Sequence, residues 1–145
     1  MGFRAVDHSV NIIGIRKNDV NYAMCCAWAM MVDYDKLMCL LGSQSDTGNN
    51  ICKGDIIGFT SLNKNQIDVA YKLGDNHSSE VNKLDGVDYE LNGSAILING
   101  GKTVLVCEVV DILKLEGIEE DNCIYLKIIE KKENEGDFLH MSDLC

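Results

Sequence analysis

The residues best suited to chemistry lie in one polar segment that follows an expected strand. Residues 43–50 read Ser-Gln-Ser-Asp-Thr-Gly-Asn-Asn, and a short helix expected over residues 46–52 would begin there, capped by Ser45 or Asp46. Backbone N–H groups at such a strand-to-helix junction can hold a phosphate group. An ordinary helix cap explains the same residue types, so the segment by itself leaves both interpretations open.

Thiols and imidazoles are a second source of chemistry, but the seven cysteines and three histidines are dispersed. No Cys-x-x-Cys pair marks a structural zinc, a cluster or a dithiol redox centre. Cys39, Cys107 and Cys123 lie in apolar runs, where a thiol behaves as a small hydrophobe. We therefore expect reduced, mostly buried thiols and no metal site. A redox sensor built on Cys25 and Cys26 is disfavoured, because a disulfide between adjacent cysteines strains the intervening peptide.

Length and charge exclude several classes of protein. The chain has 145 residues, no proline and a formal net charge of −10, without a break in composition. This length predicts one domain over residues 1–145. The negative charge repels nucleic acids and anionic membrane surfaces, so neither is an expected partner. No apolar run approaches the roughly 20 residues that span a bilayer, and the N-terminus lacks a signal-peptide pattern. We expect a cytoplasmic protein.

The elements that must position the polar segment are mostly strands. Alternating and continuous apolar runs predict strands over residues 11–15, 20–31, 36–41, 55–62, 94–98, 103–115 and 123–129. A second helix is expected over residues 63–74, where Asn63 and Gln66 have capping-box spacing. Residues 75–88 are polar and predict a long surface loop, and residues 130–141 predict a charged tail. About seven strands with two short helices favour a mainly β class, a β-barrel with helical inserts.

The run over residues 20–31 differs from the other expected strands, because both of its faces are apolar. Such a strand in an antiparallel protein is covered by the core on one side and by a ligand or a partner subunit on the other.

Several motifs, in the same order and at similar spacing, resemble the flavin reductase family, which includes the flavoredoxins. Met24-Cys25-Cys26-Ala27-Trp28 resembles the family's Met-Thr-x-Ala-Trp pattern. Ser45-x-Thr47-x-x-x-Ile51 resembles its Ser-x-Thr-x-x-x-Ile segment. Residues 54–66 are similar to the family's next strand and helix, and residues 121–126 to its final barrel strand. The resemblance covers residues 9–130.

This resemblance implies an FMN-binding split β-barrel, usually a homodimer with the flavin in a groove between the subunits. It implies that the isoalloxazine and ribityl groups contact Met24, Cys25, Cys26, Ala27 and Trp28. It also implies that the phosphate end is held by Ser43, Gln44, Ser45 and Thr47. A core or dimer-interface position explains Trp28 equally well.

Three departures from the family pattern bear on activity. Cys25 stands where the family usually has Thr, and Tyr34-Asp35 replaces its usual Pro-Pro. Asp121-Asn122 occupies the place where NAD(P)H-dependent reductases of the family often have Asp-His. The missing His disfavours nicotinamide-linked activity, and the acidic charge favours a basic protein surface over an anionic nucleotide.

We predict an oxidoreductase-like flavoprotein that transfers electrons through bound FMN, either to a redox partner protein or from NAD(P)H, with catalytic residues unassigned. The alternative is a non-catalytic split barrel that binds or senses flavin.

Overall fold

The computed structural model describes residues 3–42, 45–75 and 84–144, and these residues form a curled antiparallel sheet with short helices. The elements in chain order are β1 (Asn11–Lys17), β2 (Val20–Cys26), β3 (Ala29–Asp33), β4 (Lys36–Leu41), α1 (Asp46–Asn50), β5 (Ile56–Ser61), α2 (Ile67–Asp75), β6 (Tyr89–Asn92), β7 (Ala95–Ile98), β8 (Thr103–Leu113), β9 (Asn122–Glu133) and the 3-10 turn η1 (Met141–Asp143).

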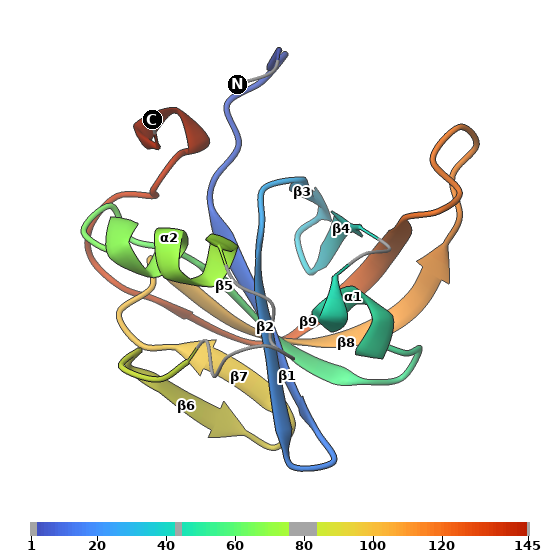
Figure 1. The fold of residues 1–145 in the computed structure, drawn as a ribbon, viewed down its shortest axis with the longest axis horizontal. Helices are drawn as coiled ribbons and strands as arrows, with labels where there is room; N and C mark the ends of the chain where they lie inside the picture. The colour runs from blue at the N-terminus through green and yellow to red at the C-terminus, as the bar shows by residue number, and fades with distance from the viewer. Residues whose placement is uncertain (1–2, 43–44, 76–83, 145) are drawn as a thin grey trace.

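The strands pair in the order β3-β4-β9-β8-β5-β1-β7-β6, and β2 pairs with β1 outside this path. Figure 1 shows α1 and α2 on either side of the β1–β2 hairpin, with the hairpin that joins β8 to β9 projecting away from both. The predicted mainly β class with short helical inserts is confirmed.

Two apolar cores flank β1, because successive side chains of a strand point to opposite faces. Ile13 packs inside the curled sheet with Ile57, Phe59 and Cys107. Ile12 packs on the other face, in a cluster that includes Leu73 of α2. The predicted burial of Cys39, Cys107 and Cys123 is confirmed, and none of the six described cysteines is in a disulfide.

The single strand predicted over residues 20–31 is wrong, because the chain bends between β2 and β3. The Ala29 N–H donates to the Ala27 carbonyl at 2.9 Å, which closes a tight turn. The Leu40 N–H then donates to the Trp28 carbonyl at 2.8 Å. The apolar run thus contains two strands, one paired with β1 and the other with β4.

Three other boundaries differ from the prediction. α2 begins at Ile67 rather than Asn63, although the Asn63 N–H does donate to Gln66 Oε1 at 2.9 Å. The expected loop over residues 75–88 lies partly outside the described residues, and the short strand β6 that follows it was not predicted. β9 continues through the charged residues to Glu133, because these pair with β8.

Within the described ranges, no helix is long and apolar enough to cross a membrane. In the same part of the chain, no group of three or more His, Cys, Asp or Glu side chains is placed to hold a metal ion.

Candidate functional site

The first predicted site segment, Met24 to Trp28, covers the end of β2 and the bend that leads to β3. Cys26 is the register partner of Asn11 on β1, and the Asn11 Nδ2 group donates to the Cys26 carbonyl at 3.0 Å. Trp28 is held on the other side by its backbone bond to Leu40 of β4. The bend is therefore fixed at both ends.

Side chains of this segment point in different directions. Cys26 is buried in the core of the curled sheet, with Sγ 3.6 Å from the Trp28 carbonyl oxygen. The Cys25 Sγ donates to the Ala70 carbonyl of α2 at 3.4 Å, and Met24 packs against the same core as Cys26. Trp28 is 59% exposed. Adjacent thiols on opposite faces of β2 are poorly placed for a disulfide, and Trp28 is the member of the segment with a side chain open to a ligand.

The second predicted segment forms the start of α1. Ser45 is its N-cap: Oγ accepts from the Gly48 N–H at 2.9 Å and donates to the Gly42 carbonyl at 2.9 Å. The predicted cap at Ser45 is confirmed. Thr47 is buried, and Ser43 and Gln44 lie outside the described residues. The Ser45 N–H also donates to the Gly42 carbonyl, at 3.1 Å, so a contact from Thr47 to a phosphate would come from its backbone N–H group rather than from its buried hydroxyl.

The start of β9 lies next to the end of β4 and to α1. Asn122 is the register partner of Leu41 at the end of β4, and its Nδ2 group donates to the Gly48 carbonyl of α1 at 3.5 Å. Lys114 Nζ donates to Asn122 Oδ1 at 2.6 Å, which places a positive charge beside α1. The sequence interpretation missed Lys114. Its one signal was a lysine within the otherwise acidic stretch over residues 111–121.

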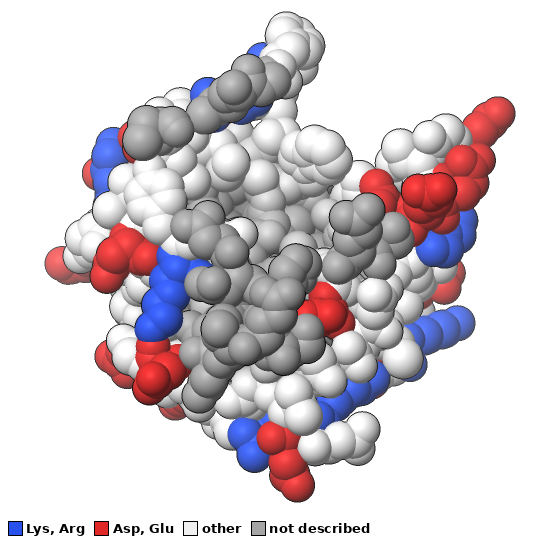
Figure 2. Space-filling model, in the orientation of Figure 1, with Lys and Arg blue, Asp and Glu red and all other residues white. Residues whose placement is uncertain are grey.

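An apolar cavity, here called the Trp28 cavity, opens beside this cluster and has a volume of about 280 Å³. Figure 2 shows mainly uncharged side chains across the hollow between the N-terminal segment and the β8–β9 hairpin, with acidic side chains on the hairpin. The cavity lies against both, and it is lined by His8, Trp28, Ala29, Met30, Met38, Cys39, Leu40, Leu115 and Cys123. An exposed indole beside apolar walls fits a planar ring.

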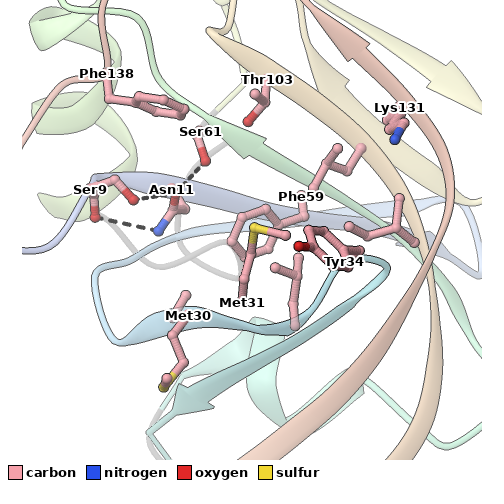
Figure 3. A pocket seen from close by; sticks show the side chains of 14 residues that line it. Ser9, Asn11, Met30, Met31, Tyr34, Phe59, Ser61, Thr103, Lys131 and Phe138 are labelled. Carbon is pink, nitrogen blue, oxygen red and sulfur yellow. Dashed lines mark hydrogen bonds between the residues drawn. The ribbon is translucent and has the colours of Figure 1, made fainter.

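A second cavity, here called the Asn11 cavity, lies on the other side of β3 and has a volume of about 320 Å³ (Figure 3). It is lined by Ser9, Asn11, Ala29, Met30, Met31, Tyr34, Leu37, Phe59, Ser61, Thr103, Leu105, Ile128, Lys131 and Phe138. None of the predicted site residues that the structure describes lines it. Ala29 and Met30 border both cavities, so β3 is the wall between them.

Several solved structures with a similar fold are flavin proteins. NADH:FAD oxidoreductase SgcE6 from Streptomyces globisporus matches with a TM-score of 0.79 and 15% identity, over 92% of this chain and 84% of its own. The fold is that of the flavin reductases. Flavoredoxin from Methanosarcina acetivorans has a TM-score of 0.78 and 15% identity, over 93% and 75% of the two chains.

The FMN-binding protein from Thermus thermophilus, solved with bound 1-cyclohex-2-enone, has a TM-score of 0.81 and 14% identity, over 93% of this chain and 76% of its own. No family model and no curated protein matches the sequence. The predicted split barrel is thus confirmed as a flavin reductase fold, and the flavin contacts of individual residues remain a prediction.

Proposed function

We propose that this protein binds FMN with the isoalloxazine ring in the Trp28 cavity and the phosphate toward residues 42–47. The observation that carries the proposal is the position of Trp28, exposed at an apolar cavity at the same end of β4 as the start of α1. The proposed contacts are the exposed Trp28 indole, the backbone of Met24, Cys25, Cys26 and Ala27, and the phosphate-side residues Ser43, Gln44, Ser45 and Thr47. The flavin reductase fold supports the same placement.

Bound flavin would supply the redox chemistry, and the chain would bind and orient it. The Trp28 indole would cover one face of the ring and exclude water from it. Lys114 would offset part of the negative charge that Asp46 brings to the phosphate end. Because the Ser45 hydroxyl is engaged in the helix cap, phosphate binding would depend on main-chain N–H groups and on this lysine.

A titration of FMN, followed by quenching of its fluorescence, tests this site directly. Trp28→Ala should weaken FMN binding about tenfold, because stacking of a ring on an aromatic side chain is worth about 1–3 kcal/mol. Lys114→Gln should weaken FMN binding but not riboflavin binding, since riboflavin lacks the phosphate. Lys132→Gln, which removes a charge from an exposed position of β9, is the control. Equal FMN affinity in Trp28→Ala and the parent protein would contradict the proposed site.

We further propose that the flavin passes electrons to a protein partner with a basic surface rather than taking them from free NAD(P)H. The net charge of −10 attracts a cationic surface and repels an anionic nucleotide. Asn122 also stands at the position where a histidine would favour nicotinamide-linked chemistry. Electron transfer from the reduced flavoprotein to a basic acceptor such as cytochrome c should slow as salt is added, whereas a rate independent of salt would argue against such a partner.

We also propose that a second copy of this chain packs against β3 in a homodimer. Met30, Met31 and Val32 are 63%, 57% and 44% exposed on this strand, next to Trp28. Exposed apolar patches of this kind mark interaction surfaces, and a homodimer would shield them. Sedimentation should show a dimer that Met31→Lys dissociates; a monomeric parent protein would contradict this assembly.

The alternative is a non-catalytic module that binds or senses flavin. Asn122 in place of the family's histidine and Cys25 in place of its threonine favour this interpretation. Steady-state oxidation of NADH and NADPH with excess FMN separates the candidates: turnover above background supports a reductase. Flavin binding without turnover, and without electron transfer to any basic acceptor, supports the module.

A further inference from the structure

We propose that the Asn11 cavity binds a small aromatic carboxylate that carries a hydroxyl or N–H group, at a site separate from the proposed flavin site. Strand register builds this cavity from two rows of residues. One row joins Asn11 to Ser61 and Thr103, and the other joins Phe59, Leu105 and Lys131. Residues two apart on a strand share a face, so the polar row lies beside a row of two apolar residues and Lys131.

Two hydroxyls at the polar end of the cavity, those of Ser9 and Ser61, can accept a hydrogen bond from a ligand but have no free proton to donate. Asn11 and Ser61 are only 1% and 6% exposed. The Ser61 hydroxyl donates to Asn11 Oδ1 at 2.7 Å, and the Ser9 hydroxyl donates to the same oxygen at 3.1 Å (Figure 3). Because each hydroxyl has a single proton, these two groups present only lone pairs to a ligand. A ligand that bonds Ser9 or Ser61 must therefore bring a donor, a hydroxyl or an N–H group, whereas the Thr103 hydroxyl can donate or accept.

The middle of the cavity is suited to an aromatic ring. Phe59 lies at its centre in Figure 3, with Tyr34, Met31 and Phe138 around it. Aromatic rings pack well against other rings and against thioether sulfur. The volume of about 320 Å³ accommodates a one- or two-ring compound but is at the lower limit for ligand pockets.

The far end of the cavity carries a positive charge. Lys131 is the register partner of Leu105, which places it on the cavity side of β9. Figure 3 shows it at the opposite end from Ser9, and it forms no ion pair with any carboxylate among the described residues. Lys131 is exposed to solvent, so a carboxylate on the ligand would pair with it at the mouth of the cavity, while the donor group reaches Ser61.

Calorimetric titration with 3-(indol-3-yl)propanoate tests the proposal on the full chain, since this probe has a ring N–H, two fused rings and a carboxylate. Lys131→Met should weaken binding about tenfold, equal to about 1.4 kcal/mol, while leaving the affinity for the corresponding primary amide unchanged. Lys132→Met is the matched control, one residue further along β9. The benzothiophene analogue, which lacks the N–H, should bind the parent protein more weakly than the indole.

Four outcomes would overturn the proposal. The first is no binding of the probe at millimolar concentration, and the second is an equal loss of probe affinity in Lys131→Met and Lys132→Met. The third is equal affinity for the indole and benzothiophene probes, and the fourth is competition between the probe and FMN. FMN affinity should be the same in Lys131→Met and the parent protein. A failure of this second site is therefore distinguishable from a failure of the flavin site.

Discussion

Asn11→Ala should destabilise the protein and loosen the bend that carries Trp28. The Asn11 amide is buried and uses both of its ends: Oδ1 accepts from the Ser9 and Ser61 hydroxyls, and Nδ2 donates to the Cys26 carbonyl. It therefore ties the N-terminal segment and β5 to the end of β2. Alanine removes all of these bonds at once and introduces no replacement.

The expected cost follows from the groups left behind. A buried polar group without a partner costs about 1–3 kcal/mol. The Cys26 carbonyl loses a donor, and the Ser61 hydroxyl, 6% exposed, loses its acceptor. The Ser9 end is more accessible to water, which offsets its loss. We expect the free energy of unfolding to fall by about 3 kcal/mol, together with several-fold weaker FMN binding.

Urea denaturation measures this change, provided that the slope of the transition is unaltered. Asn92→Ala is the control, because its side chain bonds Glu130 at 2.7 Å on the exposed surface; a loss below about 0.5 kcal/mol is expected there. Asn11→Ala and Asn92→Ala with similar stability would refute the reasoning. Lower stability with unchanged FMN affinity would show that Asn11 does not act on the bend.

Three further predictions concern packing, titration and thiol reactivity. Gly58→Ala should destabilise the fold by about 3 kcal/mol or prevent folding, because its Cβ would overlap the Ile96 carbonyl oxygen; a parent-like urea midpoint would contradict the packing of β5 on β7. The hydrogen bond from the Ser142 hydroxyl lowers the pKa of Asp7. This hydrogen bond therefore stabilises the fold at pH values above the Asp7 pKa of the unfolded chain. The stabilisation is lost as the pH falls through the lower Asp7 pKa of the folded protein. Ser142→Ala should raise the Asp7 pKa, measured by carboxyl NMR, and no change would exclude that hydrogen bond as the cause. Burial raises the pKa of Cys107 to about 12, so a thiol reagent should leave Cys107 of the native protein unlabelled and react at exposed Cys52. Cys52→Ser should remove one rapidly reacting thiol per chain. Rapid labelling at Cys107 would contradict its burial.

Strand composition predicted most of the sheet, because alternating apolar residues report which positions face a core. It could not locate the bend between β2 and β3. Residues 23–32 are apolar or sulfur-containing throughout, without a glycine or a polar turn. The bend is fixed by bonds to distant strands, such as the one between Leu40 and Trp28. By contrast, the turn after β1 was predictable, because Asn18 and Asp19 tolerate the positive φ angles that they adopt.

The two cavities differ in how much of them the sequence could reveal. The contiguous motif that ends in Trp28 points to one of them through its resemblance to the flavin reductase pattern. Ser9, Ser61 and Lys131 of the other are each ordinary residues in their own segments. They come together only through the register of β1, β5, β8 and β9. Register depends on pairing between distant segments, which a local pattern of residue types does not determine.

The most direct test of the central claim is a titration of the isotope-labelled protein with FMN, followed by the backbone amide NMR signals. Binding at the proposed site should shift the signals of residues 24–28, of the start of α1 and of residues 121–123, and leave those of β6 and η1 in place. Shifts confined to the Asn11 cavity, or no shift at millimolar FMN, would contradict the account.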